Sequence, residues 1–246
     1  MEGTNYMDTI RIDKANKPLM IAHRGLSGIE KENTASAFVA AGHHSYFGIE
    51  TDVHRTGDGK FIIIHDESTK RVAGDEVNVE ETCFDTLRAI RLIDTDGRKG
   101  RWDLVLPSLD EYIRICKKYE KEAVLELKNH FDPEDIRRIV EVIREEGYLD
   151  HVIFISFDLP NMICIRELLP DQRAQFLIST AEDWLIDTLK KHRLSLDIKY
   201  TALTKDLADQ VHAIGQEVNV WTVNTLEDAE RMIRMGVDYI TTNILE

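Results

Sequence analysis

Ionisable side chains stand directly after apolar runs in the first third of this chain. Residues 19–22 are apolar and lead into His23 and Arg24, and the apolar residues 61–64 lead into His65. An unpaired charge inside a buried strand is costly, or it shifts its protonation. In α/β folds, catalytic groups are normally presented where strands end. These side chains therefore indicate a functional site.

Glu50 and Asp52 carry a more specific signal, because they are two residues apart in a largely apolar stretch. In a strand, side chains two residues apart point to the same face. Neighbouring carboxylates repel each other unless a positive charge lies between them, and a hard divalent cation is the usual solution. The spacing favours a metal site. The alternatives are one protonated carboxylate, or an edge strand on which both groups face solvent.

The composition suits one large domain. The chain has 246 residues, of which 43% are hydrophobic, enough for one α/β barrel or for two small domains. No window looks like a linker, so we expect a single domain. No run of about 18 apolar residues is present, and the N-terminus lacks the pattern of a secretion signal. We expect a cytoplasmic protein without a membrane partner.

The formal net charge of −14 restricts the partners further. Nucleic acids and anionic membranes attract basic proteins, so we expect no nucleic acid to bind here. An anionic small molecule would need a local group of cations, or a metal, to offset the general repulsion. The three cysteines lie far apart and predict neither a disulfide framework nor a zinc ribbon.

The elements that must position these side chains begin with two strands, at 47–53 and 61–65, joined by turn-forming residues. A hairpin there would bring His65 back level with Glu50. The polar segment 66–106 that follows is longer than an ordinary connection, and it predicts a lid or insertion.

The rest of the chain alternates more plainly, which indicates a parallel sheet with helices outside. Nine strand candidates are present, whereas a closed barrel has eight. One strand beside the 57–60 turn, or the weak 194–200 run, must therefore be peripheral or antiparallel. We expect helices at 133–146, 160–168, 181–192, 204–214 and 226–235, and strands at 151–157, 174–178, 194–200, 216–223 and 237–241.

A further strand, at 123–128, repeats the pattern of an apolar run that contains charges. Glu126 interrupts it and Lys128 closes it, and the two share one face because they are two residues apart. Seven short motifs now stand in order: His23-Arg24-Gly25, Glu32-Asn33-Thr34, Glu50-x-Asp52, His65-Asp66, Leu125-Glu126-Leu127-Lys128, Ser156-Phe157 and Trp221-Thr222-Val223-Asn224. Together they resemble the glycerophosphodiester phosphodiesterase family over residues 19–242, and they are specific for the superfamily rather than for one substrate.

The resemblance implies a (β/α)8 TIM barrel formed by residues 1–246, with the site at the C-terminal ends of the strands. It also implies one divalent metal ion, Mg²⁺ or Ca²⁺, bound by Glu50, Asp52 and Glu126. His23 and His65 would act as acid and base, because an imidazole titrates near neutral pH.

Arg24 and Lys128 are implied as phosphate contacts, and Trp221 as a wall of the pocket against the glycerol carbons. Each also has a structural interpretation: the two cations pair with the carboxylates, and the tryptophan belongs to the core. Glu32 and Asn33 either take part directly or brace the loop that carries Arg24.

Two positions depart from the family pattern. Lys31 stands where a proline is usual before Glu-Asn-Thr, and Asn243 stands where an aspartate is often found. We interpret residues 1–17 as an arm that covers the barrel bottom. The sequence given ends at Glu246 before a final helix, so we expect this arm, or a partner subunit in a homo-oligomer, to close that side of the barrel.

By this resemblance, we expect metal-dependent hydrolysis of glycerophosphodiesters to sn-glycerol 3-phosphate and an alcohol. The alternative is a phospholipase D-like enzyme that acts on lysophospholipids or other phosphodiesters. An apolar, exposed lid would favour that alternative, whereas residues 66–106 are rich in charge. A non-catalytic barrel that binds a metal or phosphate would have lost a histidine or a ligand, and none is missing.

Overall fold

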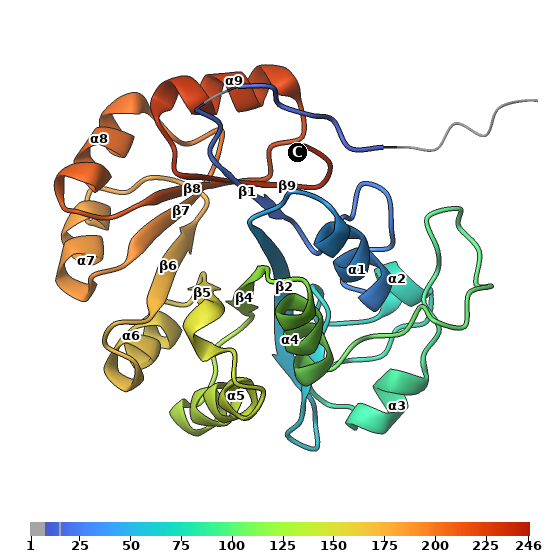
Figure 1. The fold of residues 1–246 in the computed structure, drawn as a ribbon. Coiled ribbons are helices and arrows are strands. Elements are labelled where there is room, and N and C mark those ends of the chain that lie inside the picture. The colour runs from blue at the N-terminus through green and yellow to red at the C-terminus, as the bar shows by residue number, and fades with distance from the viewer. Residues whose placement is uncertain (1–7, 15) are drawn as a thin grey trace, which may run out of the picture.

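The computed structural model describes residues 8–14 and 16–246 (Figure 1). The strands are β1 (Leu19–Ala22), β2 (Gly48–Arg55), β3 (Phe61–Ile63), β4 (Glu122–Leu127), β5 (Val152–Ser156), β6 (Arg173–Ile178), β7 (Ser195–Lys199), β8 (Val218–Trp221) and β9 (Tyr239–Thr242). Within the described residues they form one sheet in the order β1-β9-β8-β7-β6-β5-β4-β2-β3, and β1 also pairs with β2. That pairing closes eight parallel strands into a (β/α)8 barrel, as predicted.

Helices cover the outside of the barrel (Figure 1). They are α1 (Ala35–His43), α4 (Leu109–Lys118), α5 (Pro133–Glu145), α6 (Leu159–Leu168), α7 (Leu185–His192), α8 (Lys205–Ala213) and α9 (Leu226–Met235), with the 3₁₀ turn η1 (Leu149–His151). Side-chain caps explain several of the starts. Thr34 accepts a hydrogen bond from the amide of Ala37, and Ser108 forms a capping box with Glu111. No helix in the described residues is long and apolar enough to cross a membrane.

The ninth strand is β3, which lies outside the ring. It pairs antiparallel with β2, with Val53 opposite Ile63. The amide of Ile64 then donates to the carbonyl of Asp52 at 3.1 Å, so the hairpin brings His65 back beside the β2 carboxylates. The weak run at 194–200 is a full barrel strand, β7, which settles the choice that the sequence left open.

Segment 66–106 contains the two short helices α2 (Lys70–Ala73) and α3 (Phe84–Ala89). It has an apolar cluster of its own, in which Ile62 and Ile64 pack with Val72, Leu87 and Leu104. This cluster fixes the insertion against the hairpin rather than against the main barrel core. Its action as a lid stays a prediction.

The described part of the N-terminal arm pairs with the C-terminal segment. The amide of Ile10 donates to the carbonyl of Ile244 at 3.0 Å, and the amide of Glu246 donates back to Ile10 at 2.8 Å. The Glu246 carboxylate accepts from the amide of Ser45 at 2.7 Å, just before β2. This part of the arm therefore lies beside the last residues of the chain (Figure 1); residues 1–7 and 15 of the predicted arm lie outside the described residues.

Candidate active site

The acidic triad consists of Glu50 and Asp52 on β2 and Glu126 on β4. Asp52 and Glu126 stand opposite each other in the parallel register. One carboxylate oxygen from each residue lies within 4.8 Å of the others, and all three side chains are buried. Asp52 Oδ1 is buried without a hydrogen-bond partner. Buried, oxygen-only ligands with one oxygen left free fit a hard cation such as Mg²⁺ or Ca²⁺.

Two cations contact the triad. Lys128 Nζ lies 2.8 Å from Glu126 Oε1 and 3.6 Å from Asp52 Oδ1, and Arg24 Nε lies 3.6 Å from Asp52 Oδ2. The Arg24 backbone is left-handed (φ 55°), and its amide donates to Glu50 Oε2 at 2.8 Å. When all three carboxylates are ionised, their charge exceeds that of the two cations by one, so the site favours a further positive charge.

The pKa values of the triad show how the excess negative charge is handled without an ion. Burial, together with Asp52 and Glu126, raises the pKa of Glu50 well above its usual value. Burial and the nearby Asp52 raise the pKa of Glu126 to about 8. For Asp52, burial acts in the same direction, but Lys128 and Arg24 outweigh it and lower the pKa. A proton on one of the two glutamates thus takes the place of a cation.

The two histidines face the same pocket from different strands, and each is held through Nδ1. His23 Nδ1 lies 2.7 Å from Asn243 Oδ1, and His65 Nδ1 lies 2.6 Å from Asp66 Oδ1. Burial and then Arg24 lower the pKa of His23 to about 4. Burial also lowers the pKa of His65, although Asp52 opposes it. Both imidazoles are therefore neutral at pH 7 in the ion-free protein, with Nε2 available.

A chain of charged contacts links Arg24 to His65. Arg24 donates to Glu32 at 2.8 Å, and Glu32 also accepts from Arg71 of the insertion at 2.6 Å. Arg71 in turn donates to Asp66 at 2.7 Å, beside His65. Glu32 therefore has the contacts of a brace, one of the two interpretations left open by the sequence. Arg71 had no signal in the sequence, because only the folded insertion brings it here.

Asn33 braces the triad from the same loop. Its Nδ2 donates to Asp52 Oδ2 at 2.8 Å, and its Oδ1 accepts from the hydroxyl of Thr51 at 2.7 Å. Its left-handed backbone (φ 53°) is uncommon for a residue other than glycine. Asparagine adopts this conformation more readily than most side chains, so Asn33 can hold the Asp52 carboxylate in place from this loop.

The pocket above these groups is a small cavity of about 90 Å³. It is lined by His23, Arg24, Glu50, His65, Glu126, Ile155, Phe157, Leu177, Asp197, Trp221, Thr222 and Thr241. Six of the eight residues singled out in the sequence are among these. Asp52 is buried beside Glu126 on the neighbouring strand, and Lys128 lines an adjoining hollow of about 310 Å³. The structure thus brings all eight together.

Trp221 forms one wall of the pocket. Its ring meets Phe157 edge-on, with centroids 5.5 Å apart, and its indole N–H donates to the carbonyl of Asp197 at 3.4 Å. Asp197 itself was not singled out in the sequence. A lone aspartate between Leu196 and Ile198, in the weak strand candidate 194–200, was the available signal, of the same kind as Glu126 in its strand.

Comparisons with known proteins agree with this site. The profile of the glycerophosphoryl diester phosphodiesterase family matches residues 23–246. A glycerophosphodiester phosphodiesterase of Caldanaerobacter subterraneus subsp. tengcongensis is 30% identical over 231 residues, which cover 92% of this chain and 94% of that protein.

Solved structures are similar over the same length. An Oleispira antarctica phosphodiesterase in complex with the product sn-glycerol-3-phosphate has a TM-score of 0.83 at 25% identity, covering 92% of this chain and 93% of that one. A glycerophosphodiester phosphodiesterase from Parabacteroides distasonis has a TM-score of 0.77 at 28% identity, covering 92% of this chain and 94% of that one. This chain belongs to the glycerophosphoryl diester phosphodiesterase family of enzymes.

Proposed function

We propose that this chain hydrolyses glycerophosphodiesters to sn-glycerol 3-phosphate and an alcohol. The observation that carries the proposal is the meeting of an acidic triad, two histidines and two cations around one pocket and the hollow that adjoins it. The family membership and the product-bound relative support it. Glu50, Asp52 and Glu126 would hold one Mg²⁺ or Ca²⁺. When bound, such an ion polarises a phosphoryl group and offsets the charge of the transition state.

Arg24 and Lys128 are proposed to bind the phosphate. Arg24 Nε is buried without a hydrogen-bond partner, so a phosphate oxygen would satisfy it. A guanidinium offers paired donors to phosphate oxygens, while a lysine acts as a point charge. Together they offset the repulsion between an anionic substrate and a chain with a net charge of −14.

The partners of the histidines suggest their roles. His65 is backed by the carboxylate of Asp66, which stabilises an imidazolium. We assign it the role of the acid: it takes up a proton at Nε2 when the anionic substrate binds, and then donates that proton to the leaving alkoxide. His23 is backed by the neutral amide of Asn243, and its pKa is low. We therefore assign its Nε2 the removal of a proton from the attacking hydroxyl or water.

The test is an assay of glycerol 3-phosphate release from glycerophosphocholine and glycerophosphoethanolamine, with Mg²⁺, Ca²⁺ or Mn²⁺ and with EDTA. We expect release that depends on the metal and is lost in Glu126→Gln. No release with any of the three ions would contradict the proposed function. Activity that survives both His23→Ala and His65→Ala would contradict the assigned mechanism alone.

One observation favours lysophospholipids as a second class of substrate. Four large apolar side chains are widely exposed on loops and helix starts that follow barrel strands or belong to the insertion: Trp102 (82%), Phe157 (45%), Trp184 (47%) and Leu226 (47%). Apolar residues at the catalytic end of a barrel could contact an acyl chain. Release of choline from lysophosphatidylcholine, measured in the same assay, tests this candidate, and its absence would remove it.

A further inference from the structure

Buried polar atoms without a hydrogen-bond partner are rare, and each needs an explanation. Within residues 8–14 and 16–246 there are four such side-chain atoms: Arg24 Nε, the Tyr46 hydroxyl, Asp52 Oδ1 and Asp197 Oδ1. The proposed phosphate and metal contacts account for Arg24 and Asp52. Asp197 belongs to neither contact, yet it lines the catalytic pocket.

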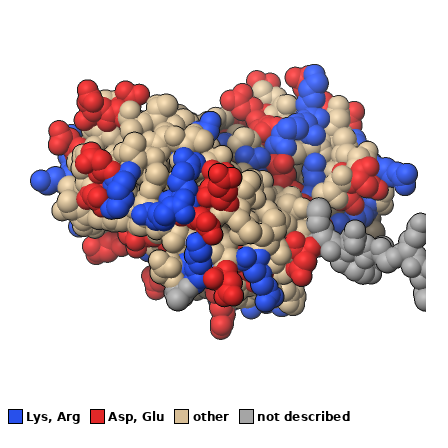
Figure 2. Space-filling view, turned by 90° about the horizontal axis from the view of Figure 1, so that it is seen from above, with Lys and Arg blue, Asp and Glu red and all other residues tan. Residues whose placement is uncertain are grey.

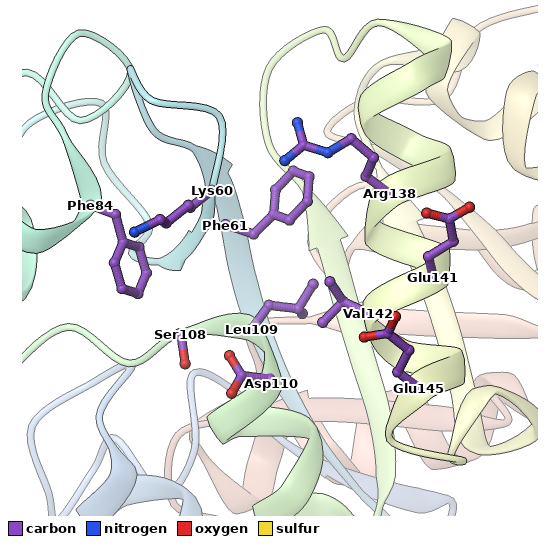
Figure 3. Close-up of a pocket in the computed structure, with 10 residues that line it drawn as sticks. All are labelled: Lys60, Phe61, Phe84, Ser108, Leu109, Asp110, Arg138, Glu141, Val142 and Glu145. Carbon is purple, nitrogen blue, oxygen red and sulfur yellow. The ribbon is translucent and has the colours of Figure 1, made fainter.

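A second hollow, beside the hairpin, contains none of these four atoms. It has a volume of about 380 Å³, and Phe61, Leu109 and Val142 line its apolar part (Figure 3). Its basic side chains already have partners: Lys60 lies over the ring of Phe84, and Arg138 pairs with Asp135. This hollow therefore gives no indication of a ligand, and Asp197 is the stronger feature.

Asp197 lies on β7, which is separated from β2 by half of the barrel ring. It stands opposite Leu177 and Asn219 in the register. The amide of Asn219 donates to Gln175 Oε1 at 3.2 Å, and its oxygen accepts from the hydroxyl of Thr241 at 3.2 Å. This side of the barrel interior is thus polar, but its groups are neutral.

Burial raises the pKa of Asp197 to about 8, although Asn219 opposes the shift. At neutral pH the side chain is therefore mainly a protonated acid, which offers one donor and one acceptor. An alcohol hydroxyl also donates once and accepts, so the two groups are complementary. A phosphate oxygen is a poorer match, because it can only accept a hydrogen bond and so leaves the carbonyl oxygen of the acid without a partner.

The shape of the pocket beside Asp197 fits a short carbon chain. Ile155, Leu177 and Trp221 provide apolar walls. The cavity of about 90 Å³ is several times the roughly 10–15 Å³ that one water molecule needs. Carbons would pack on Trp221, while a hydroxyl on them would lie against the carboxyl group of Asp197, one oxygen of which has no hydrogen-bond partner.

We propose that Asp197 hydrogen-bonds a hydroxyl of the glycerol part of the substrate, and so makes the pocket selective for a short polyol over an apolar chain of the same length. This inference rests on the proposed function and names a residue that decides its substrate class. Trp221 would supply the contact to the carbons, and Asp197 the recognition of the hydroxyl.

The test compares two ligands of equal length, sn-glycerol 3-phosphate and propyl phosphate, by isothermal titration calorimetry with saturating Mg²⁺. We expect the wild-type protein to bind glycerol 3-phosphate at least about 10-fold more tightly, the typical effect of one buried hydrogen bond. Asp197→Leu should reduce that ratio to below about threefold. Asp197→Asn keeps a donor and an acceptor and should retain most of the preference.

Tyr46→Phe is the matched control, because it also removes a buried polar atom without a partner but lies outside the pocket. Tyr46→Phe should leave the ratio of the two binding affinities unchanged. Asp197→Ala replaces Asp197→Leu if the leucine variant does not fold, as judged by circular dichroism. An unchanged ratio in the folded variant, equal binding of both ligands to the wild type, or no measurable binding of either would overturn the inference.

The binding ratio separates this inference from the proposed function. A wild-type protein that prefers glycerol 3-phosphate but releases none from glycerophosphodiesters contradicts the function and leaves the role of Asp197 standing. Normal hydrolysis by the wild type, together with an unchanged binding ratio in Asp197→Leu, contradicts the role of Asp197 and leaves the proposed function standing.

Discussion

Two opposite sides of the same barrel interior bury carboxyl groups in different ways. On β2 and β4, three carboxylates lie within 4.8 Å of one another and contact Arg24 and Lys128. On β7, Asp197 is just as buried, but its neighbours are the neutral Gln175, Asn219 and Thr241 network. The surface outside is mixed, with acidic and basic side chains interspersed on the face drawn in Figure 2.

The difference lies in what compensates the buried acid. On the triad side, cations hold Asp52 ionised, and the remaining negative charge suits a further positive ion. On the β7 side no cation contributes to the shift, so Asp197 is stable mainly as a neutral acid at pH 7. One side therefore fits a metal and a phosphate, and the other fits an uncharged hydroxyl.

The largest effect is expected from Asp52→Asn. It removes the ionised ligand and leaves Arg24 and Lys128 without their shared partner, so activity should fall by about 1000-fold or more. Bound Mg²⁺ should also cease to raise the midpoint of thermal unfolding. Asp197→Asn is the comparison, and there the Mg²⁺-induced rise should persist. A rise of equal size in Asp52→Asn would break the distinction between the two sides.

Removal of either histidine should lower the activity less than loss of the metal ion does. His23→Ala and His65→Ala are each expected to lower kcat by about 10²- to 10⁴-fold, the usual contribution of a general acid or base. In both variants Mg²⁺ should still raise the midpoint of thermal unfolding, because neither histidine is among the proposed metal ligands. His151→Ala is the control, since this exposed histidine pairs with Glu122 at the opposite end of the barrel. An equally large loss of activity in that variant would contradict the assignment.

Sequence patterns predicted the charged side better than the neutral one. Glu50 and Asp52 are two apart, and Glu126 interrupts an apolar strand, so spacing and a family motif agree on the triad. Asp197 gives a similar local signal, but Ser195 and Lys199 make its strand look weak, and no motif marks it.

The contacts between segments could not be predicted, because they depend on register and on the folded insertion. Strand β7 enters the barrel only because β6 and β8 pair with it on both sides. Arg71 reaches Glu32 only after the insertion has packed on its own apolar cluster. Thus the alternation of strands and helices was predictable, while the position of each strand in the ring was not.

Asn243→Asp should shift the pH dependence of the reaction. A carboxylate in place of the amide next to His23 Nδ1 raises the pKa of the imidazole, which is about 4 in this chain. A base with a higher pKa is protonated at higher pH, so the acid limb of the kcat/KM profile should move upward. An unchanged limb would mean that His23 is not the group that titrates there.

Ion binding on the triad side should release protons. Burial and Asp52 raise the pKa of Glu126 to about 8, so the ion-free protein holds a proton there at pH 7. A bound cation displaces it, and the Mg²⁺ affinity should therefore weaken as the pH falls from 8 to 6. Calorimetry in buffers of different ionisation enthalpy counts the protons released. Binding without proton release would show that the triad is already fully ionised.

The smallest effect concerns stability on the β7 side. The folded pKa of Asp197, about 8, is above its unfolded value. Between the two values the native state binds more protons than the unfolded state, so this group's contribution to stability is lost as the pH rises towards 8. Asp197→Asn removes that loss. The substitution should raise the unfolding midpoint by at least about 2 °C more at pH 9 than at pH 5. An equal change in the midpoint at the two pH values would contradict a neutral Asp197.

Crystals soaked in Mn²⁺ and measured at its absorption edge test the metal assignment most directly. The three carboxylates should surround a single anomalous peak, with oxygen atoms of Glu50, Asp52 and Glu126 at about 2.0–2.6 Å from it. No peak there, in crystals of a protein whose activity requires Mn²⁺, would contradict the assignment of the triad as the metal site.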